Sequence, residues 1–300
     1  MEDAASAPPI ALRNVLAATD FSAPSRTALS YALSITRRYG ATLYLAHVVR
    51  PDPLSPADSE TNRSAVEEAW RDGQRLTTDL IVSGELRGVE HHLLVGEGEI
   101  WEGLAPMVAA QSIDMIVVGT RGRTGLAKVL LGSVAERIFR NATCPVLTVG
   151  PNSPGPSDSE QGLRRILYAT DFTAQSLHAA GYAISLARQF RAHLVLMHVI
   201  SGAAADSSAK GQLLDNAKEQ LRSLVTGQVL DFEPEFVVGF GTPPARILEV
   251  AAEKSPEVIV LGVTQSGRGA FSSHRWTNAS EITGKAACPV LTVRKPETSG

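Results

Sequence analysis

The sequence predicts an α/β protein made of two doubly wound domains, each with a mainly parallel five-stranded sheet flanked by helices. Three observations lead to this prediction. The 300 residues suit two domains of roughly 150 residues each. Short apolar runs alternate with helical stripes, as is typical of β-α units around a parallel sheet. Most of the pattern occurs twice, and so long a period indicates a duplicated domain rather than a solenoid.

In the first half, apolar runs and their boundaries predict the individual elements. Each expected strand is a short apolar run of the kind that is buried on both faces of a parallel sheet. The expected strands are 14–18, 42–49, 91–95, 114–118 and 146–149. The first expected helix follows an N-cap at Ser22, and two more helices span 64–82 and 100–110. A fourth helix is expected to begin at Gly132-Ser133 and to end before Cys144-Pro145. The proline-rich stretch 50–62 predicts a long loop.

The second half repeats the first after a linker rich in Gly, Pro and Ser. Leu167 to Phe172 repeat the pattern of Leu16 to Phe21, and CPVLTV occurs identically at 144–149 and at 288–293. We therefore expect one domain at 1–149, a linker at 150–162 and a second domain at 163–300, with a loose arm at 1–11.

Bulk composition excludes several classes of function. The net charge of −3 gives no general attraction to nucleic acid or to anionic membranes. The N-terminal stretch has no basic region followed by an apolar core, and no run reaches the ~18 apolar residues of a membrane span. Cys144 and Cys288 occupy equivalent places in the two repeats, so we expect both to be reduced, buried thiols of a cytoplasmic protein.

The stretch 114–149 carries the strongest chemical signal. A strand leads into a basic loop containing Gly119 and Gly122, and Gly132-Ser133 then opens a helix. Glycine lets backbone approach a ligand closely, and the N–H groups at a helix start attract anions. The spacing therefore favours a phosphate site.

This stretch, GTRGRTGLAKVLLGS, resembles the ATP motif of the universal stress protein family, with two residues between the first glycines and nine before Gly-(Ser/Thr). The flanking ATDF, AHVV and CPVLTV also resemble that family, and the likeness covers nearly the whole chain in its tandem form. The resemblance implies an adenine nucleotide alpha hydrolase-like fold in each half, with ATP and Mg²⁺ as the expected ligands.

The resemblance also assigns roles within the expected crevice. The nucleoside side would meet the end of the first strand, Val48 would meet adenine, and the glycine motif would bind phosphates. Asp20 is better suited to ribose hydroxyls, or to magnesium through water, than to phosphate, because like charges repel. The expected ATP-binding residues are Ala18, Thr19, Asp20, Val48, Val118, Gly119, Arg121, Gly122, Gly132, Ser133 and Val134, and Arg123 and Lys128 are further candidates to neutralise phosphate.

Structural roles remain open beside these assignments. Asp20 alone could cap the first helix, and the basic residues of the loop could form a solvated face. His47 and His198 occur at matching apolar strand positions and are interpreted as packed, hydrogen-bonded histidines rather than ligands. Trp101 is interpreted as helix packing rather than stacking on a base.

The second half departs from the motif where phosphate would bind. Gly262 matches Gly119, but Trp276-Thr277 or, by the other alignment, Arg275-Trp276 stands where Gly132-Ser133 would be. A bulky residue at a helix start obstructs the approach of phosphate to backbone. We therefore expect one competent site for each chain, in the first half.

The resulting hypothesis is a cytoplasmic, ATP-binding stress-response regulator, with no catalytic residues predicted. A slow ATPase is one alternative, although no GxxxxGK(S/T) loop is present. A nucleotide-independent scaffold is the other alternative, and it suits the second half better. We also expect the two domains to pair within the chain through antiparallel contact of strands 146–149 and 290–293. A homodimer is a further open arrangement, and no nucleic-acid or membrane partner is expected.

Overall fold

The structure is a computed structural model that describes residues 10–51, 60–120, 132–156, 162–201, 207–263 and 270–295. It divides into two compact units, Ala11–Pro151 and Asn152–Gly300, and Ile10 belongs with the second. Each unit is a parallel sheet with helices on both faces. The predicted fold class is therefore confirmed for each half of the chain.

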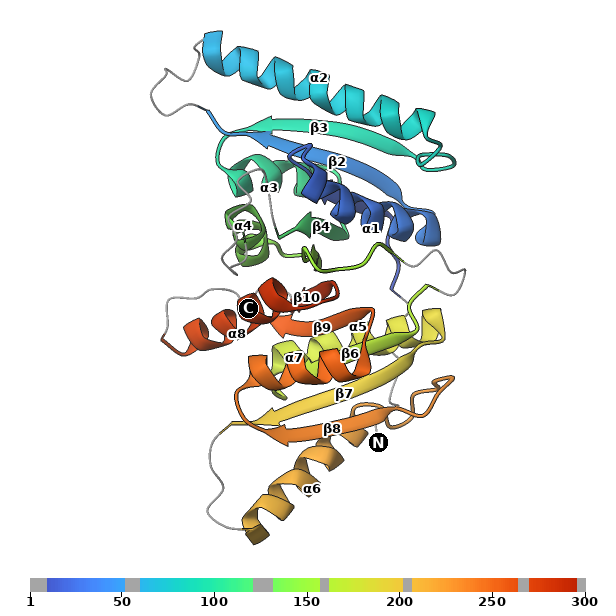
Figure 1. Ribbon diagram of the computed structural model, residues 1–300, viewed down its shortest axis with the longest axis vertical. Helices are drawn as coiled ribbons and strands as arrows, with labels where there is room; N and C mark the ends of the chain where they lie inside the picture. Colours follow the sequence, from blue (N-terminus) through green and yellow to red (C-terminus); the bar gives the residue numbers. More distant parts are fainter. Residues whose placement is uncertain are drawn as a thin grey trace. The chain divides into compact units, whose positions relative to one another are not determined.

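In the first unit, the five parallel strands follow the order β3-β2-β1-β4-β5. The chain moves outward from β1 to β3, returns across the sheet, and continues with β4 on the other side of β1. The elements are β1 Asn14–Ala18, α1 Ala23–Tyr39, β2 Thr42–Val49, α2 Glu60–Val82, β3 His91–Glu97, α3 Ile100–Ala110, β4 Met115–Gly119, α4 Ser133–Asn141 and β5 Val146–Val149 (Figure 1).

The direction of these crossovers assigns the helices to the two faces of the sheet. Parallel crossovers are right-handed, so α1 and α2 cover one face, and α3 and α4 cover the other, where they contact each other. The central strands are consequently buried on both sides, and Val15, Leu16 and Ile116 are fully inaccessible. This burial explains why the strands read as continuous apolar runs without alternation.

The second unit repeats this architecture, with the parallel strand order β10-β9-β6-β7-β8. Its elements are β6 Arg165–Thr170, α5 Ala174–Phe190, β7 His193–Ile200, α6 Ser207–Ser223, β8 Glu235–Phe240, α7 Pro243–Lys254, β9 Val258–Val263, α8 Ala270–Lys285 and β10 Val290–Arg294. Ile10 is fixed to α5, because its N–H donates to Ser185 Oγ at 2.8 Å and its carbonyl accepts from Gln189 Nε2 at 2.8 Å. The expected loose arm is thus anchored at Ile10.

Some predicted boundaries were wrong. Helix α2 begins at Glu60 rather than Ser64, with an acidic residue in its first turn, where the helix dipole favours negative charge. Strand β3 continues to Glu97 because the paired strand β2 extends equally far. By contrast, the predicted end of the fourth helix before Cys144-Pro145 is confirmed, since α4 ends at Asn141.

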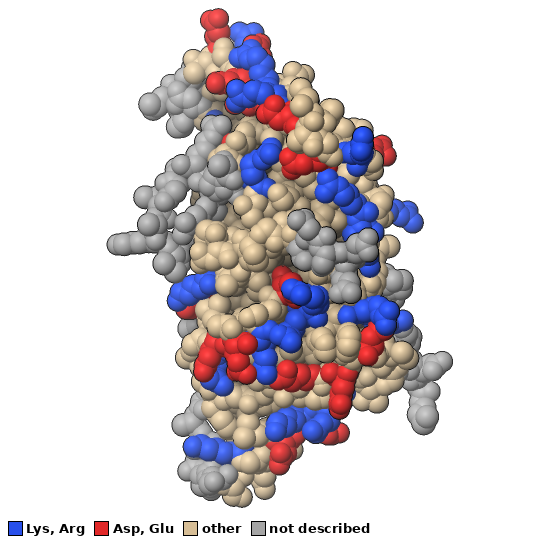
Figure 2. All heavy atoms as spheres, turned by 45° about the vertical axis from the view of Figure 1, so that its right-hand side comes forward, with Lys and Arg blue, Asp and Glu red and all other residues tan. Residues whose placement is uncertain are grey.

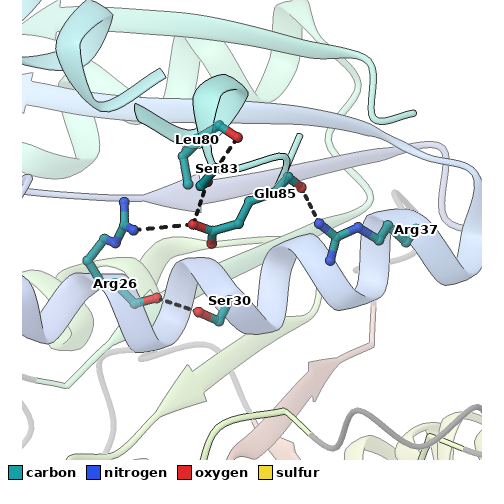
Figure 3. A network of polar contacts seen from close by, with 6 residues as sticks. All are labelled: Arg26, Ser30, Arg37, Leu80, Ser83 and Glu85. Atoms are coloured by element: carbon teal, nitrogen blue, oxygen red, sulfur yellow. Dashed lines mark hydrogen bonds and ion pairs between the residues drawn. The ribbon is translucent and has the colours of Figure 1, made fainter. Parts of the chain in front are cut away.

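A polar network fixes α1 against the turn between α2 and β3 (Figure 3). Arg26 Nη2 lies 3.4 Å from Glu85 Oε1, which also accepts a hydrogen bond from Ser83 Oγ at 2.9 Å. Farther along α1, the Arg37 guanidinium donates to the Glu85 carbonyl. Because these side chains are partly exposed, the ion pair contributes at most about 1 kcal/mol. The network joins α1 to the turn before β3, and the first turn of α1 lies at the site described below.

The two cysteines differ in exposure despite their identical neighbours in sequence. Cys288 is buried, and burial raises the pKa of its thiol to about 12. Cys144 is half-exposed, so the expectation of two buried thiols was wrong for this residue. Neither thiol is in a disulfide.

The surface carries mixed charge. On the face drawn in Figure 2, basic and acidic side chains are interspersed. Within the ranges that the structure describes, no helix combines the length and apolarity needed to cross a membrane.

Candidate functional site

A crevice of about 390 Å³ lies at the carboxyl ends of the strands in the first unit. It opens where β1 and β4 are neighbours and the strand order reverses, which is the usual ligand position in a doubly wound sheet. Its volume falls in the range of small-molecule sites. The lining residues are Ala18, Thr19, Asp20, Ser25, Ala46, His47, Val48, Val49, Arg50, Ile100, Leu104, Gly119, Thr120, Gly132, Ser133, Val134 and Ala135.

The turn after β1 forms one wall of the crevice. Asp20 Oδ1 accepts hydrogen bonds from the Ser22 N–H at 3.1 Å and from the Ser22 hydroxyl at 2.5 Å. Ser22 is the N-cap residue of α1, but its side chain bonds Asp20 instead of capping the helix. Asp20 therefore shapes the turn before α1, and it also faces the crevice.

Backbone strain is concentrated in the same turn. Phe21 has φ of 59°, in the left-handed region that is costly for a bulky residue. Thr19 Oγ1 accepts from the Phe21 N–H at 3.0 Å and lies 3.0 Å from the Ser25 hydroxyl, so local hydrogen bonds hold the conformation.

His47 supports this turn from the neighbouring strand β2. Its Nδ1 lies 2.7 Å from the Thr19 carbonyl oxygen, which can only accept, so Nδ1 carries the proton. The ring also packs on Phe21, with centroids 4.7 Å apart. The expectation of a packed, hydrogen-bonded histidine is confirmed, and the structure adds that His47 lines the crevice.

Gly132 brings the start of α4 against the end of β4. Its N–H donates to the Thr120 carbonyl at 3.0 Å, and a Cβ at this position would lie only 2.5 Å from the same oxygen. Only glycine fits this approach without displacing backbone. The N–H groups of the first turn of α4 have no partner within the helix, and Ser133 and Val134 line the crevice. An anionic group would be stabilised at this end of the crevice.

Apolar side chains line another part of the crevice. Val48 on β2 faces Ile100 and Leu104 on α3, and all three are buried. Gly103 permits this packing, since a Cβ there would lie 2.6 Å from Val48 Cγ1. Arg50 is exposed beside this wall. The crevice thus combines apolar lining residues with a helix start suited to anions.

The structure brings together most of the residues that were predicted to bind ATP. Those lining the crevice are Ala18, Thr19, Asp20, Val48, Gly119, Gly132, Ser133 and Val134. Val118 does not line it and is 2% exposed. Arg121, Gly122, Arg123 and Lys128 lie outside the described residues. Trp101 is half-buried on α3 and is not part of the lining.

Sequence reasoning missed several lining residues. Thr120 directly follows Gly119, so the rule that places ligands at strand ends could have identified it. Arg50 similarly follows the end of β2. Ser25, Ile100 and Leu104 are helix residues whose approach to the crevice depends on how α1 and α3 pack, and no local sequence signal indicates it.

The described residues offer limited direct coordination for a metal ion. Among them, no cluster of three His, Cys, Asp or Glu side chains is placed to hold a metal. Asp20 is the carboxylate that lines the crevice, and its Oδ1 is already hydrogen-bonded to Ser22. Magnesium characteristically combines one or two carboxylates, waters and substrate phosphates, so a water-mediated role for Asp20 fits this site.

The second unit has a smaller crevice of about 110 Å³ at the equivalent place. Asp171 repeats the turn of Asp20, and its Oδ1 accepts from the Thr173 and Ser176 hydroxyls. Phe172 repeats φ of 59°, and His198 repeats the bond to a threonine carbonyl at 2.8 Å. The side chains of Arg275, Trp276 and Thr277 are not described, so their predicted effect on phosphate binding stays a prediction.

Comparisons with known proteins agree with this duplicated architecture. The model of the universal stress protein family matches residues 11–150 and again residues 162–294. The chain belongs to the universal stress protein family. A universal stress protein of Methanocaldococcus jannaschii is 33% identical over 138 residues, covering 46% of this chain and 81% of the relative.

Full-length relatives place this chain among the tandem universal stress proteins. One from Mycolicibacterium smegmatis is 26% identical over 299 residues, covering 93% of this chain and 96% of the relative. The crystal structure of a universal stress protein from Archaeoglobus fulgidus has a TM-score of 0.68 at 20% identity, covering 95% of this chain and 97% of that one. This likeness confirms the fold along both halves, which is the adenine nucleotide alpha hydrolase-like fold.

Proposed function

We propose that this universal stress protein is a cytoplasmic regulator that binds one ATP, with Mg²⁺, in the crevice of its first unit. The observation that carries the proposal is the joining of an apolar wall, the Asp20 turn and the glycine-lined start of α4 in one crevice of about 390 Å³. An adenine base, a ribose and phosphates require these three environments in this combination.

Within this proposal, the lining residues have different tasks. Val48 and Ile100 would pack against the base, and the N–H groups following Gly132 would donate to phosphate oxygens. Asp20 would accept from ribose hydroxyls or from water on the magnesium ion. ATP then acts as a sensed ligand, which shifts the protein toward the conformation that binds it better.

The second unit would serve as the pseudo-symmetric partner of the first and leave its own crevice without nucleotide. Its crevice of about 110 Å³ is below the usual range for such ligands. Pairing of the two units within the chain, and any homodimer, belong to the same proposal.

The decisive experiment identifies nucleotide carried by the protein itself. Protein purified without added ligand is denatured, and the released small molecules are identified by mass spectrometry, followed by calorimetric titration of stripped protein with ATP and Mg²⁺. We expect ATP to be released and to rebind. If stripped protein shows no heat of ATP binding with or without Mg²⁺, the proposal is wrong.

A further inference from the structure

Thr120 has a buried hydroxyl for which the protein supplies no partner. The residue is 4% exposed, and among the described residues nothing forms a hydrogen bond with its Oγ1. An unpaired buried hydroxyl is destabilising, so such a group in a native structure calls for an explanation. Thr148, on β5, is also buried with an unpaired Oγ1, but it does not line the crevice.

The position of Thr120 connects its hydroxyl to the candidate site. Strands β1 and β4 are paired in parallel register, with Ala18 opposite Val118. Asp20 lies two residues after Ala18, and Thr120 lies two residues after Val118, so they follow two adjacent strands at the same level. Both residues line the crevice. The backbone of Thr120 is fixed, because its N–H donates to Val149 O and its carbonyl accepts from the Gly132 N–H.

The two halves of the chain differ at this position. Gly119 corresponds to Gly262, so the counterpart of Thr120 is Val263, which lines the smaller crevice and has no hydroxyl. The turn after the first strand is instead retained, since Asp20 corresponds to Asp171 in the same hydrogen-bonded conformation. Thr120 is thus one polar lining residue of the first crevice that an apolar residue replaces in the second.

We propose that Thr120 is a specificity-determining contact that hydrogen-bonds a ribose hydroxyl of the bound nucleotide. The inference rests on the proposed nucleotide site. A ribose diol needs partners that both accept and donate; a carboxylate such as Asp20 can only accept, whereas a threonine hydroxyl can do both. The Thr120 hydroxyl is buried as it stands, and rotation about the Cα–Cβ bond to another staggered position would let it reach a ligand in the crevice. The site consequently prefers ribonucleotides to deoxyribonucleotides.

The test compares Thr120→Val, which introduces the residue found at the equivalent position of the second half, with Thr120→Ser and Thr148→Val. Calorimetry measures the affinities of ATP, 2′-deoxy-ATP and 3′-deoxy-ATP, and thermal unfolding measures the stability of each unliganded variant. We expect Thr120→Val to bind ATP about 3- to 10-fold more weakly, the range of one hydrogen bond. It should also lose the preference for ATP over the deoxynucleotide, while Thr120→Ser retains it and Thr148→Val binds as the wild type does.

Stability separates this role from a structural one. Removing an unpaired buried hydroxyl should leave the melting temperature of Thr120→Val unchanged or raised, as for Thr148→Val. A fall in melting temperature together with equal losses for all three nucleotides would assign Thr120 a structural role and overturn the inference. If the wild type binds ATP and Thr120→Val binds it equally well, the inference alone fails. If the wild type binds no ATP, the proposed function fails with it.

Discussion

Replacing Gly132 with alanine adds a single methyl group at the tightest backbone contact of the site. The new Cβ would lie 2.5 Å from the Thr120 carbonyl oxygen, closer than carbon and oxygen approach in folded proteins. Overpacking of this kind costs about 1–3 kcal/mol. Alanine is also a poorer N-cap than glycine at the start of α4, although it lowers the entropy of the unfolded chain. The net expectation is a loss of about 1–3 kcal/mol in unfolding free energy.

The same methyl group should reduce ATP binding. Relief of the clash moves the start of α4 away from β4, and with it the N–H groups proposed to hold phosphate, so we expect affinity to fall at least tenfold. Denaturant unfolding and calorimetric titration measure the two effects. Gly155→Ala is the matched control, because a Cβ there meets no atom within 4 Å. Wild-type affinity together with wild-type stability in Gly132→Ala would refute this reasoning. Gly132→Trp is a poorer probe, since the contact with Thr120 means that it disturbs the fold as well as the crevice.

Four further predictions concern the two crevices, the two cysteines and the last strand of each unit. Native mass spectrometry should show saturation at one nucleotide per chain, and saturation at two would disprove the inactivity of the second crevice. A thiol reagent should modify half-exposed Cys144 much faster than buried Cys288 in the native protein. Because the pKa of Cys288 is raised to about 12, the folded state keeps the proton that the unfolded chain loses above its thiol pKa of about 8.5. Unfolding free energy should therefore fall as pH rises from about 9, and Cys288→Ala should remove up to about 1.4 kcal/mol per pH unit of that slope. If the last strands pair, hydrogen exchange should find the amides of 146, 148, 290 and 292 protected, and rapid exchange there would exclude the pairing.

The choice of those amides follows from the hydrogen bonds of β5 and β10. The Ile116 N–H donates to Pro145 O and the Thr120 N–H to Val149 O, so alternate residues from 145 to 149 face β4. Leu147 is one of them. Proline at this position would therefore break the sheet of the first unit, and it cannot serve as a selective test of pairing between units.

The sequence predicted those features that depend on local pattern and strand order. The strands, the duplicated architecture and the convergence of Asp20, Val48 and Gly119 at one edge all follow from apolar runs and the geometry of parallel sheets. The unpaired hydroxyl of Thr120 could not be predicted, because it depends on what surrounds the side chain in the folded unit. The exposure of Cys144 has the same origin, since its hexapeptide is identical to that of buried Cys288.

The hydrogen bond between Gly132 and Thr120 has a consequence for how such a site can change over time. The bond joins the residues on either side of segment 121–131 at a donor–acceptor distance of 3.0 Å, so it links the end of β4 directly to the start of α4. Loop-closure entropy rises only about 0.6 kcal/mol for each doubling of loop length. The segment between them can therefore change in sequence or length while the strand and the helix stay in place, so a new ligand preference can arise at this junction.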